Sequence, residues 1–297
     1  MTVGDLGEHA LVARVVARLG GPPAPAGPGD DAAVVPTPDG RVVVTTDLLV
    51  EGRHFRLDWS TPYDVGRKAA AQNLADVAAM GAVPTALLVG LAAPASFRLD
   101  AADALVDGLR EECALVGATV VGGDVVAADA LTLAVTALGD LHGLPPVTRA
   151  GARLGDVVVV AGDVGWSAAG LALLRRGIGE GPLVEVHRRP RPPYDAGPAL
   201  AALGATAMCD TSDGLVADLG HVARASGVRI DLHGAALRPT ARGVTLADVL
   251  HGGEDHALVA TVPAGCGSPW PVIGAVRPGE GVWVDGGRAR GGFDHFR

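Results

Sequence analysis

The chain has 297 residues, of which 48% are hydrophobic and 19% are charged, and its formal net charge is −9. This composition is typical of a globular protein of about two domains and excludes a disordered chain. The negative charge, without any basic run, excludes non-specific binding to nucleic acid. No apolar stretch reaches the roughly 18 residues of a membrane span, and the first residues lack the pattern of a signal sequence. We therefore expect a cytoplasmic protein that makes no use of a membrane.

Two further features of the composition restrict the chemistry. The three cysteines, Cys113, Cys209 and Cys266, are widely spaced and form neither a disulfide framework nor a zinc motif, so we expect reduced thiols in or near the core. Lys68 is the only lysine, and no phosphate-binding loop of the Walker type occurs. An acidic chain of this kind that handles phosphates needs metal cations to neutralise them.

The first motif follows a predicted hairpin near the start of the chain. A glycine and two acids, Gly29 to Asp31, begin one strand, and the turn at Pro38 to Gly40 leads into a second strand over 41–44. That strand is expected to end at Thr45-Thr46-Asp47, and antiparallel pairing would place Asp30 at the same end. Oxygen ligands of these kinds suit Mg²⁺. Taken alone, the stretch is equally compatible with a polar hairpin edge.

Helices and strands alternate through the rest of the first half. Apolar spacing predicts a helix over 8–19, and Thr61-Pro62 with Gly81 predicts a helix over 61–80. Asp76 lies with Gln72 and Asn73 on a polar face of this alanine-rich helix. We expect a functional role for Asp76, and the alternative is a plain exposed polar face. Later, the strand over 118–121 is expected to end in Gly122-Gly123-Asp124, where glycines would let backbone N–H groups approach a phosphate. The other predicted elements are a strand over 85–91, a helix over 100–116 and a strand over 131–138.

A glycine- and proline-rich segment predicts a domain boundary between residues 145 and 146. In the second domain a short strand over 206–209 leads to Asp210-Thr211-Ser212-Asp213 and then to a helix beginning at Leu215. The start of that helix would add positive potential for a phosphate, although a simple N-cap is the alternative. Gly252-Gly253-Glu254-Asp255 forms another acidic corner. The other predicted elements are strands over 155–162 and 257–262 and helices over 167–176 and 245–250.

The ordered set of motifs resembles the thiamine-monophosphate kinase family along essentially the whole chain. The motifs that carry the resemblance are Gly-Asp-Asp-Ala-Ala-Val, Thr-Thr-Asp-x-x-Val-Glu-Gly-x-His-Phe, Ala-x-Asn-x-Ala-Asp-x-Ala-Ala-Met-Gly-Ala, Gly-Gly-Asp, Asp-x-Ser-Asp-Gly-Leu, Gly-Gly-Glu-Asp and the terminal Gly-Phe-Asp-His-Phe. That family belongs to the aminoimidazole ribonucleotide synthetase superfamily of ATP-binding enzymes. The resemblance implies an α/β (α+β) fold of two domains, an N-terminal ATP- and Mg²⁺-binding domain over 1–145 that dimerises and a C-terminal α/β domain over 146–297. A homodimer is implied.

The resemblance also implies a reaction and a set of site residues. The reaction is transfer of the γ-phosphoryl group of ATP to thiamine monophosphate, giving thiamine diphosphate and ADP. The implied Mg²⁺ ligands are Asp30, Thr45, Thr46, Asp47, Asp76, Asp124, Asp210 and Asp213. The implied ATP contacts are Gly123, Asp124, Arg149 and Ser212, and the implied thiamine-phosphate contacts are His54, Glu254 and Phe293. Two departures are His256, where the family usually has tyrosine, and the lack of an aromatic residue over 103–112.

The residues themselves agree with this mechanism. Donor and acceptor are both phosphates that repel each other, so several Mg²⁺ ions held by carboxylates would neutralise them and align an in-line attack. The acceptor oxygen is already nucleophilic, so we expect direct transfer with no covalent nucleophile on the protein. Two alternatives remain: a sister enzyme of the superfamily with another acceptor, and a non-catalytic sensor of nucleotide or metal.

Overall fold

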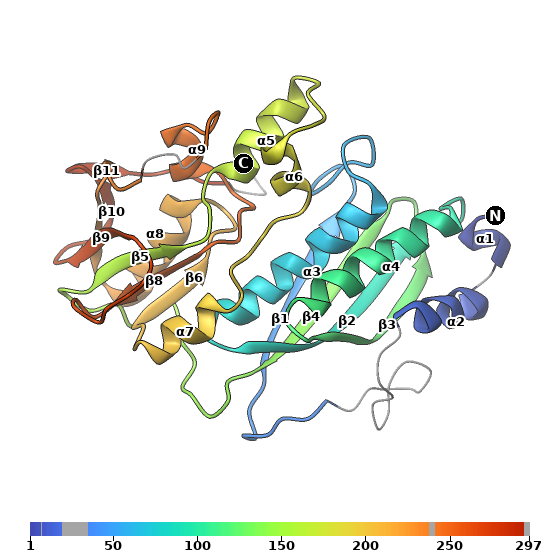
Figure 1. The fold of residues 1–297 in the computed structure, drawn as a ribbon, viewed down its shortest axis with the longest axis horizontal. Coiled ribbons are helices and arrows are strands. Elements are labelled where there is room, and N and C mark those ends of the chain that lie inside the picture. The colour runs from blue at the N-terminus through green and yellow to red at the C-terminus, as the bar shows by residue number, and fades with distance from the viewer. Residues whose placement is uncertain (7, 20–34, 238–240, 294–297) are drawn as a thin grey trace. The chain divides into compact units, whose positions relative to one another are not determined.

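The computed structural model describes residues 1–6, 8–19, 35–237 and 241–293 and divides the chain into two compact units (Figure 1). Unit 1 comprises Met1–Val77 with Pro84–His142, and unit 2 comprises Ala78–Val83 with Gly143–Arg297. The α/β character expected from the sequence is confirmed. The predicted boundary between residues 145 and 146 did not anticipate that residues 78–83 group with the second unit. Within the described ranges, no helix combines the length and the apolar character needed to cross a membrane.

Unit 1 is built on a four-stranded sheet. Its strands lie in the order β1 (Val43–Val50), β4 (Thr132–Asp140), β2 (Val83–Ala93) and β3 (Thr119–Ala127). β1 is antiparallel to β4, and β2 is parallel to β3. Figure 1 shows α3 (Pro62–Ala79) and α4 (Leu99–Ala114) lying across one face of this sheet. The short α1 (Val3–Leu6) precedes α2 (Glu8–Leu19), which packs against α4.

The two helices on the sheet are fixed by local sequence and by glycine contacts. The predicted start of α3 is confirmed by a reciprocal cap, in which the Thr61 N–H donates to Asp64 Oδ2 at 2.9 Å and the Asp64 N–H donates to Thr61 Oγ1 at 3.2 Å. A Cβ atom on Gly66 of α3 would collide with the carbonyl oxygen of Leu105 in α4. Gly108 of α4 meets the backbone of α3 in the same way. Only glycine therefore permits this close approach.

The strand ends predicted for unit 1 were wrong. β1 runs on to Val50, so Thr45-Thr46-Asp47 lies inside the strand and not at its end, because the ladder to β4 continues to the pair Val50–Thr132. Likewise Gly122-Gly123-Asp124 lies inside β3. The turn at residues 38–40 is confirmed, with Gly40 at a φ of 74° and its N–H donating to the Thr37 carbonyl at 3.0 Å. The expected first strand of that hairpin, with Asp30, falls largely outside the described residues.

Unit 2 contains a seven-stranded mixed sheet. In spatial order its strands are β11 (Gly287–Ala289), β10 (Gly281–Val284), β7 (Arg229–Leu232), β9 (Val272–Arg277), β5 (Val157–Ala161), β8 (Leu258–Val262) and β6 (Ala207–Asp210). All described pairs are antiparallel except β10 with β7. The helices of the unit are α5 (Trp166–Arg175), α6 (Pro182–Arg188), α7 (Ala196–Ala202), α8 (Leu215–Ser226) and α9 (Leu246–His251).

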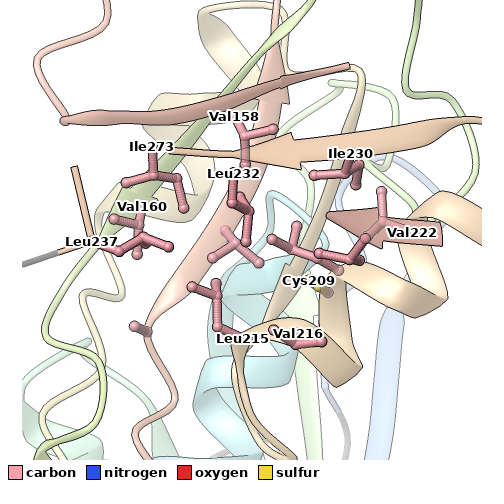
Figure 2. Packing of buried hydrophobic residues seen from close by; sticks show 14 of the residues in the cluster. Val158, Val160, Cys209, Leu215, Val216, Val222, Ile230, Leu232, Leu237 and Ile273 are labelled. Atoms are coloured by element: carbon pink, nitrogen blue, oxygen red, sulfur yellow. The ribbon is translucent and has the colours of Figure 1, made fainter. Parts of the chain in front are cut away.

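The core of unit 2 lies between α8 and the sheet. Figure 2 shows Val158 of β5 and Ile230 of β7 in the same cluster as Leu215 and Val222 of α8. Burial of one such side chain contributes about 1.5–3 kcal/mol, so the apolar stripe of α8 fixes the helix on the sheet. Cys209 belongs to this core, and burial raises the pKa of its thiol well above the ordinary value. The expectation of free thiols is confirmed for all three cysteines.

Substituting Gly66 tests the contact between α3 and α4. We expect Gly66→Ala to lower the stability of the protein by about 3 kcal/mol, because the new methyl group overlaps the Leu105 backbone. Gly220→Ala is a matched control, since the added Cβ meets nothing within 4 Å and alanine favours the helix by up to about 1 kcal/mol. Thermal unfolding followed by calorimetry measures both. Equal midpoints for the two variants would contradict the packing argument.

Candidate active site

In unit 1, β1 and α3 bring together an acidic group. Side chains alternate along β1, so Thr45 and Asp47 face α3. The Thr45 hydroxyl donates to Asp76 Oδ2 at 2.8 Å, and Gln72 Nε2 donates to Asp47 Oδ2 at 3.1 Å. Gln72 and Asp76 are four residues apart and therefore share one face of the helix. Two carboxylates and a hydroxyl, all oxygen donors, thus gather at one place in this unit.

Two other predicted metal ligands, Thr46 and Asp124, do not join this group. The Thr46 hydroxyl lies on the opposite face of the sheet, where it donates to the Val135 carbonyl at 3.0 Å and accepts from Thr136 at 3.1 Å. Asp124 stands on β3, the far edge strand, and two strands separate it from β1. At about 4.8 Å per strand, the backbones of β1 and β3 are roughly 14 Å apart. Asp30 lies outside the described residues.

Gly123 packs against a neighbouring strand, whereas the sequence predicted a glycine that lets backbone N–H groups approach a phosphate. A Cβ atom there would collide with the backbone of Val89 in β2. The contact lies beside a register shift in the β2–β3 ladder, between Leu87 and Leu88. The glycine is therefore required by strand pairing. Its predicted contact with ATP stays a prediction.

His54 is held rigidly in the turn that follows β1. The Val50 N–H donates to His54 Nδ1 at 3.0 Å, so Nδ1 is the acceptor and the neutral ring carries its hydrogen on Nε2. The buried Lys68 ammonium donates to the His54 carbonyl at 3.3 Å. The half-buried imidazole can therefore offer an N–H donor to an anionic group.

In unit 2, three backbone segments come together around the predicted site. The Glu254 N–H donates to the Ser212 carbonyl at 2.8 Å, which joins the Gly-Gly-Glu-Asp loop to the loop after β6. The Phe293 N–H donates to the Asp213 carbonyl at 2.9 Å, which brings in the C-terminal segment. Asp210 ends β6 and opens the same loop. These contacts bring together Asp210, Ser212, Asp213, Glu254 and Phe293.

Two buried side chains that the sequence reasoning did not assign support this loop. Asp218 Oδ2 accepts the N–H groups of Asp213 at 3.1 Å and of Gly214 at 3.0 Å. Burial, with added repulsion from Asp210 and Asp213, raises the pKa of Asp218 to about 8. His256 Nδ1 lies 3.0 Å from Asp210 Oδ2, and both side chains are buried. The histidine at the family's usual tyrosine position therefore holds Asp210 in place.

A metal-ligand cluster also forms beside the start of α8. Asp213, Asp218 and His221 each offer one ligand atom, and these atoms all lie within 4.8 Å of one another. Burial, and then the charges of Arg149 and Arg224, lower the pKa of His221. Asp218 lies among the apolar positions of an amphipathic helix. An acid at such a position is unusual, and this feature of the sequence could have revealed it.

Glu254 is constrained by its backbone and by α6. Its φ is 64°, a left-handed conformation that non-glycine residues rarely adopt. Its Oε2 lies 3.6 Å from Nδ1 of the buried His187, which is also 2.9 Å from the Ser167 hydroxyl. The neighbouring Asp255 accepts the N–H groups of Gly165 at 2.6 Å and Ser167 at 2.8 Å. These contacts hold the acidic loop against the start of α5, and no sequence pattern predicted them.

The pKa of Asp255 in the folded protein differs from its ordinary value, so the stability of the protein depends on pH. Burial is the largest cause and raises the pKa of Asp255 to about 6, although the N–H groups of residues 165–167 and the charge of His256 lower it. The folded state therefore binds this proton more tightly than the unfolded chain. The stabilisation is complete below about pH 4 and is lost as the pH rises to about 6.

We expect wild type to lose on the order of 3 kcal/mol relative to Asp255→Asn between pH 4 and pH 6.5, because the variant lacks this titration. Above that range the difference between the two proteins should stay constant. Urea unfolding at a series of pH values measures both. Parallel stability profiles across the whole range would show that Asp255 has an ordinary pKa in the fold.

The chain is similar to known proteins along most of its length. Residues 29–141 match the family model of the AIR synthase related protein, N-terminal domain, and residues 153–265 match that of its C-terminal domain. The thiamine-monophosphate kinase of Mycobacterium tuberculosis (strain ATCC 25618 / H37Rv) is 52% identical, over 96% of this chain and 90% of the relative.

Two solved structures have the same fold. Thiamine-monophosphate kinase from Stenotrophomonas maltophilia K279a superposes with a TM-score of 0.84 at 33% identity, over 96% of this chain and 98% of that one. AaThiL complexed with AMPPCP and TMP superposes with a TM-score of 0.81 at 33% identity, over 100% of this chain and 99% of that one. Both likenesses extend over both units.

Proposed function

This chain belongs to the thiamine-monophosphate kinase family of AIR synthase related proteins, and we propose that its carboxylates hold Mg²⁺ for a direct in-line transfer from ATP. It phosphorylates thiamine monophosphate with ATP, giving thiamine diphosphate and ADP. The observation that carries the Mg²⁺ proposal is the acidic oxygen group that each unit assembles at the motif positions.

The donor chemistry of both groups fits Mg²⁺. In unit 1 the proposed ligands are Thr45, Asp47 and Asp76, which the hydrogen bonds between β1 and α3 gather. In unit 2 they are Asp210 and Asp213. Carboxylate and hydroxyl oxygens are the ligands that this hard cation prefers. When bound, Mg²⁺ would neutralise the phosphates and stabilise the charge of the transferring group. For Asp30, Thr46 and Asp124 the ligand role stays a prediction.

The substrate contacts follow from charge and hydrogen-bonding capacity. His54 would donate from Nε2 to the phosphate of thiamine monophosphate. The Glu254 carboxylate, set by His187, suits the cationic thiazolium ring of the substrate. Phe293 is 59% exposed, so its ring is available for stacking on an aromatic heterocycle. For ATP we propose Gly123, Asp124, Arg149 and Ser212, with the Arg149 guanidinium suited to a phosphate.

We propose no covalent intermediate. The acceptor is a phosphate oxygen that is already nucleophilic, so the protein needs to position it and not to deprotonate it. Asp210 is held by His256, and the backbone of Asp213 is held by Asp218, so both carboxylates keep fixed positions. Carboxylates that are fixed in place and bind cations can align the two substrates. This arrangement favours direct transfer between the substrates over nucleophilic attack by a side chain of the protein.

A homodimer is proposed from the open face of the unit 1 sheet. The face opposite α3 and α4 exposes Val44, Leu48, Leu88 and Val126, with exposed fractions of 61%, 57%, 39% and 52%. Large aliphatic side chains gathered on one sheet face are typical of a surface that another chain covers. A second copy of this chain is the partner we propose.

The proposed location is the cytoplasm, since the buried Cys113 and Cys209 are free thiols and ATP is the donor.

Incubation with Mg-ATP and thiamine monophosphate, followed by chromatography, tests the activity and its acceptor. We expect thiamine diphosphate to accumulate with an equal amount of ADP. We expect Asp47→Asn to lose at least roughly 10²-fold in kcat, because a ligand of the cation is removed. His54→Ala should raise the KM for thiamine monophosphate about tenfold with little change in the KM for ATP, because it removes one charge-assisted hydrogen bond.

The exposed neighbour Arg53 supplies a control, since Arg53→Ala alters the same turn without changing the imidazole. Equal and mild effects of Asp47→Asn and His54→Ala would contradict the division between metal and substrate. Bound ATP without any thiamine diphosphate would favour a sensor. Turnover with another phosphate acceptor, and none with thiamine monophosphate, would favour a sister enzyme.

The dimer proposal predicts a specific dissociation. Leu48→Asp places a carboxylate in the middle of the exposed apolar face, so light scattering after gel filtration should show a monomer in place of the wild-type dimer. Leu115→Asp is the control, because this leucine is 63% exposed at the end of α4 and lies off the sheet. A wild-type monomer, or a Leu48→Asp dimer, would argue against this surface.

A further inference from the structure

A groove in unit 2 lies outside the site described above. It lies between α8 and the β10–β11 hairpin and has a volume of about 440 Å³, within the range of roughly 300–1,000 Å³ of small-molecule sites. Val216, Gly220, Ala223 and Gly227 line it from one face of the helix. Asp218 and His221 project from α8 outside that face, and none of the proposed metal or substrate residues lines the groove.

The mouth of this groove is positively charged. Arg224 of α8 and Arg288 and Arg290 of the hairpin segment all line it, and each is exposed. Within the part of the chain that the structure describes, none of the three makes an ion pair. Arg288 and Arg290 are two residues apart in an extended segment, so they extend to the same side. One acid, Glu280, accompanies them, and the local excess of positive charge contrasts with the net charge of −9.

The floor of the groove is small and apolar. A Cβ atom on Gly220 would meet nothing within 4 Å, so a ligand can lie directly on the helix there. Val216 and Val282 are almost fully buried beneath the groove, so the open floor consists of small residues such as Ala217 and Gly220. A flat, weakly polar ring suits such a floor, whereas the arginines suit phosphate oxygens, which their planar guanidinium groups bind with paired hydrogen bonds.

We propose that this groove is a second ligand site, which binds the diphosphate of an aromatic heterocycle without a metal ion. The ring lies on the floor over Gly220, and the diphosphate meets Arg224, Arg288 and Arg290. Metal independence follows from the charge of the walls, because arginines attract the anion directly. The carboxylate groups described above repel an anion unless cations are present. The proposal does not rest on the kinase reaction.

Two ligands share the required chemistry, ADP and thiamine diphosphate, and their separate titrations distinguish them. The full-length protein is titrated calorimetrically in EDTA with each, and with inorganic pyrophosphate as a probe that lacks the ring. We expect one equivalent of ADP or thiamine diphosphate to bind, and pyrophosphate to bind more weakly.

Two variants locate the binding. Arg288→Gln combined with Arg290→Gln should weaken it at least tenfold, because two charge-assisted contacts are removed. Gly220→Leu should abolish it by filling the floor, and leucine is well tolerated in a helix. Arg176→Gln is the matched control, since Arg176 is an exposed arginine at the end of α5 in the same unit, and it should bind as wild type does.

Three results would overturn the proposal. The first is no binding of either organic diphosphate in EDTA. The second is binding that survives both groove variants, which would place the anion elsewhere. The third is pyrophosphate binding as tight as that of both organic ligands, which would remove the role of the apolar floor. A failure of the kinase assignment would instead be seen as absent thiamine diphosphate in the Mg-ATP assay, so the two failures are distinguishable.

Discussion

Repulsion between neighbouring carboxylates is the constraint on which the proposed site depends. In unit 2 the buried Asp218 lies near Asp210 and Asp213, and its pKa rises to about 8. In unit 1 Thr45 and Gln72 donate to Asp76 and Asp47, which partly offsets the gathered negative charge. Such groups are costly unless a cation or a hydrogen-bond donor accompanies them. In the mechanism that we propose, Mg²⁺ ions offset this cost in an enzyme that brings two phosphates together and has one buried lysine.

The elements that carry these acids each have two functional faces. Along β1, Thr45 and Asp47 face α3, whereas Val44 and Leu48 lie on the open face that we assign to a second copy. One strand thus carries both the metal ligands and the dimer surface that we propose, because alternation sends consecutive side chains to opposite sides. The contact that holds Asp76 against that strand is the hydrogen bond from the Thr45 hydroxyl.

Helix α8 separates opposite charges in the same way. The cluster of Asp213, Asp218 and His221 lies at its start, and its side toward the β10–β11 hairpin borders the arginine-lined groove. Because the helix has a period of 3.6 residues, the metal-ligand cluster and the groove lie on different sides of it. An anion is therefore attracted directly to one side and only through a cation to the other. This arrangement lets one helix distinguish free diphosphates from metal-bound ones.

The sequence alone predicted the helix over 61–80 through its capping residues, the helix beginning at Leu215 through apolar periodicity, and the family through the order of its motifs. It also proposed most of the acids that gather in the two units, but it missed Asp218, which lies on the buried stripe of α8. Only the tertiary structure decided where β1 and β3 end, that strand pairing explains Gly123, and that Asp255 caps a helix far away in the sequence. The reason is physical: caps and periodicity act between near neighbours in the chain, whereas strand pairing and loop contacts join segments whose meeting no local pattern records.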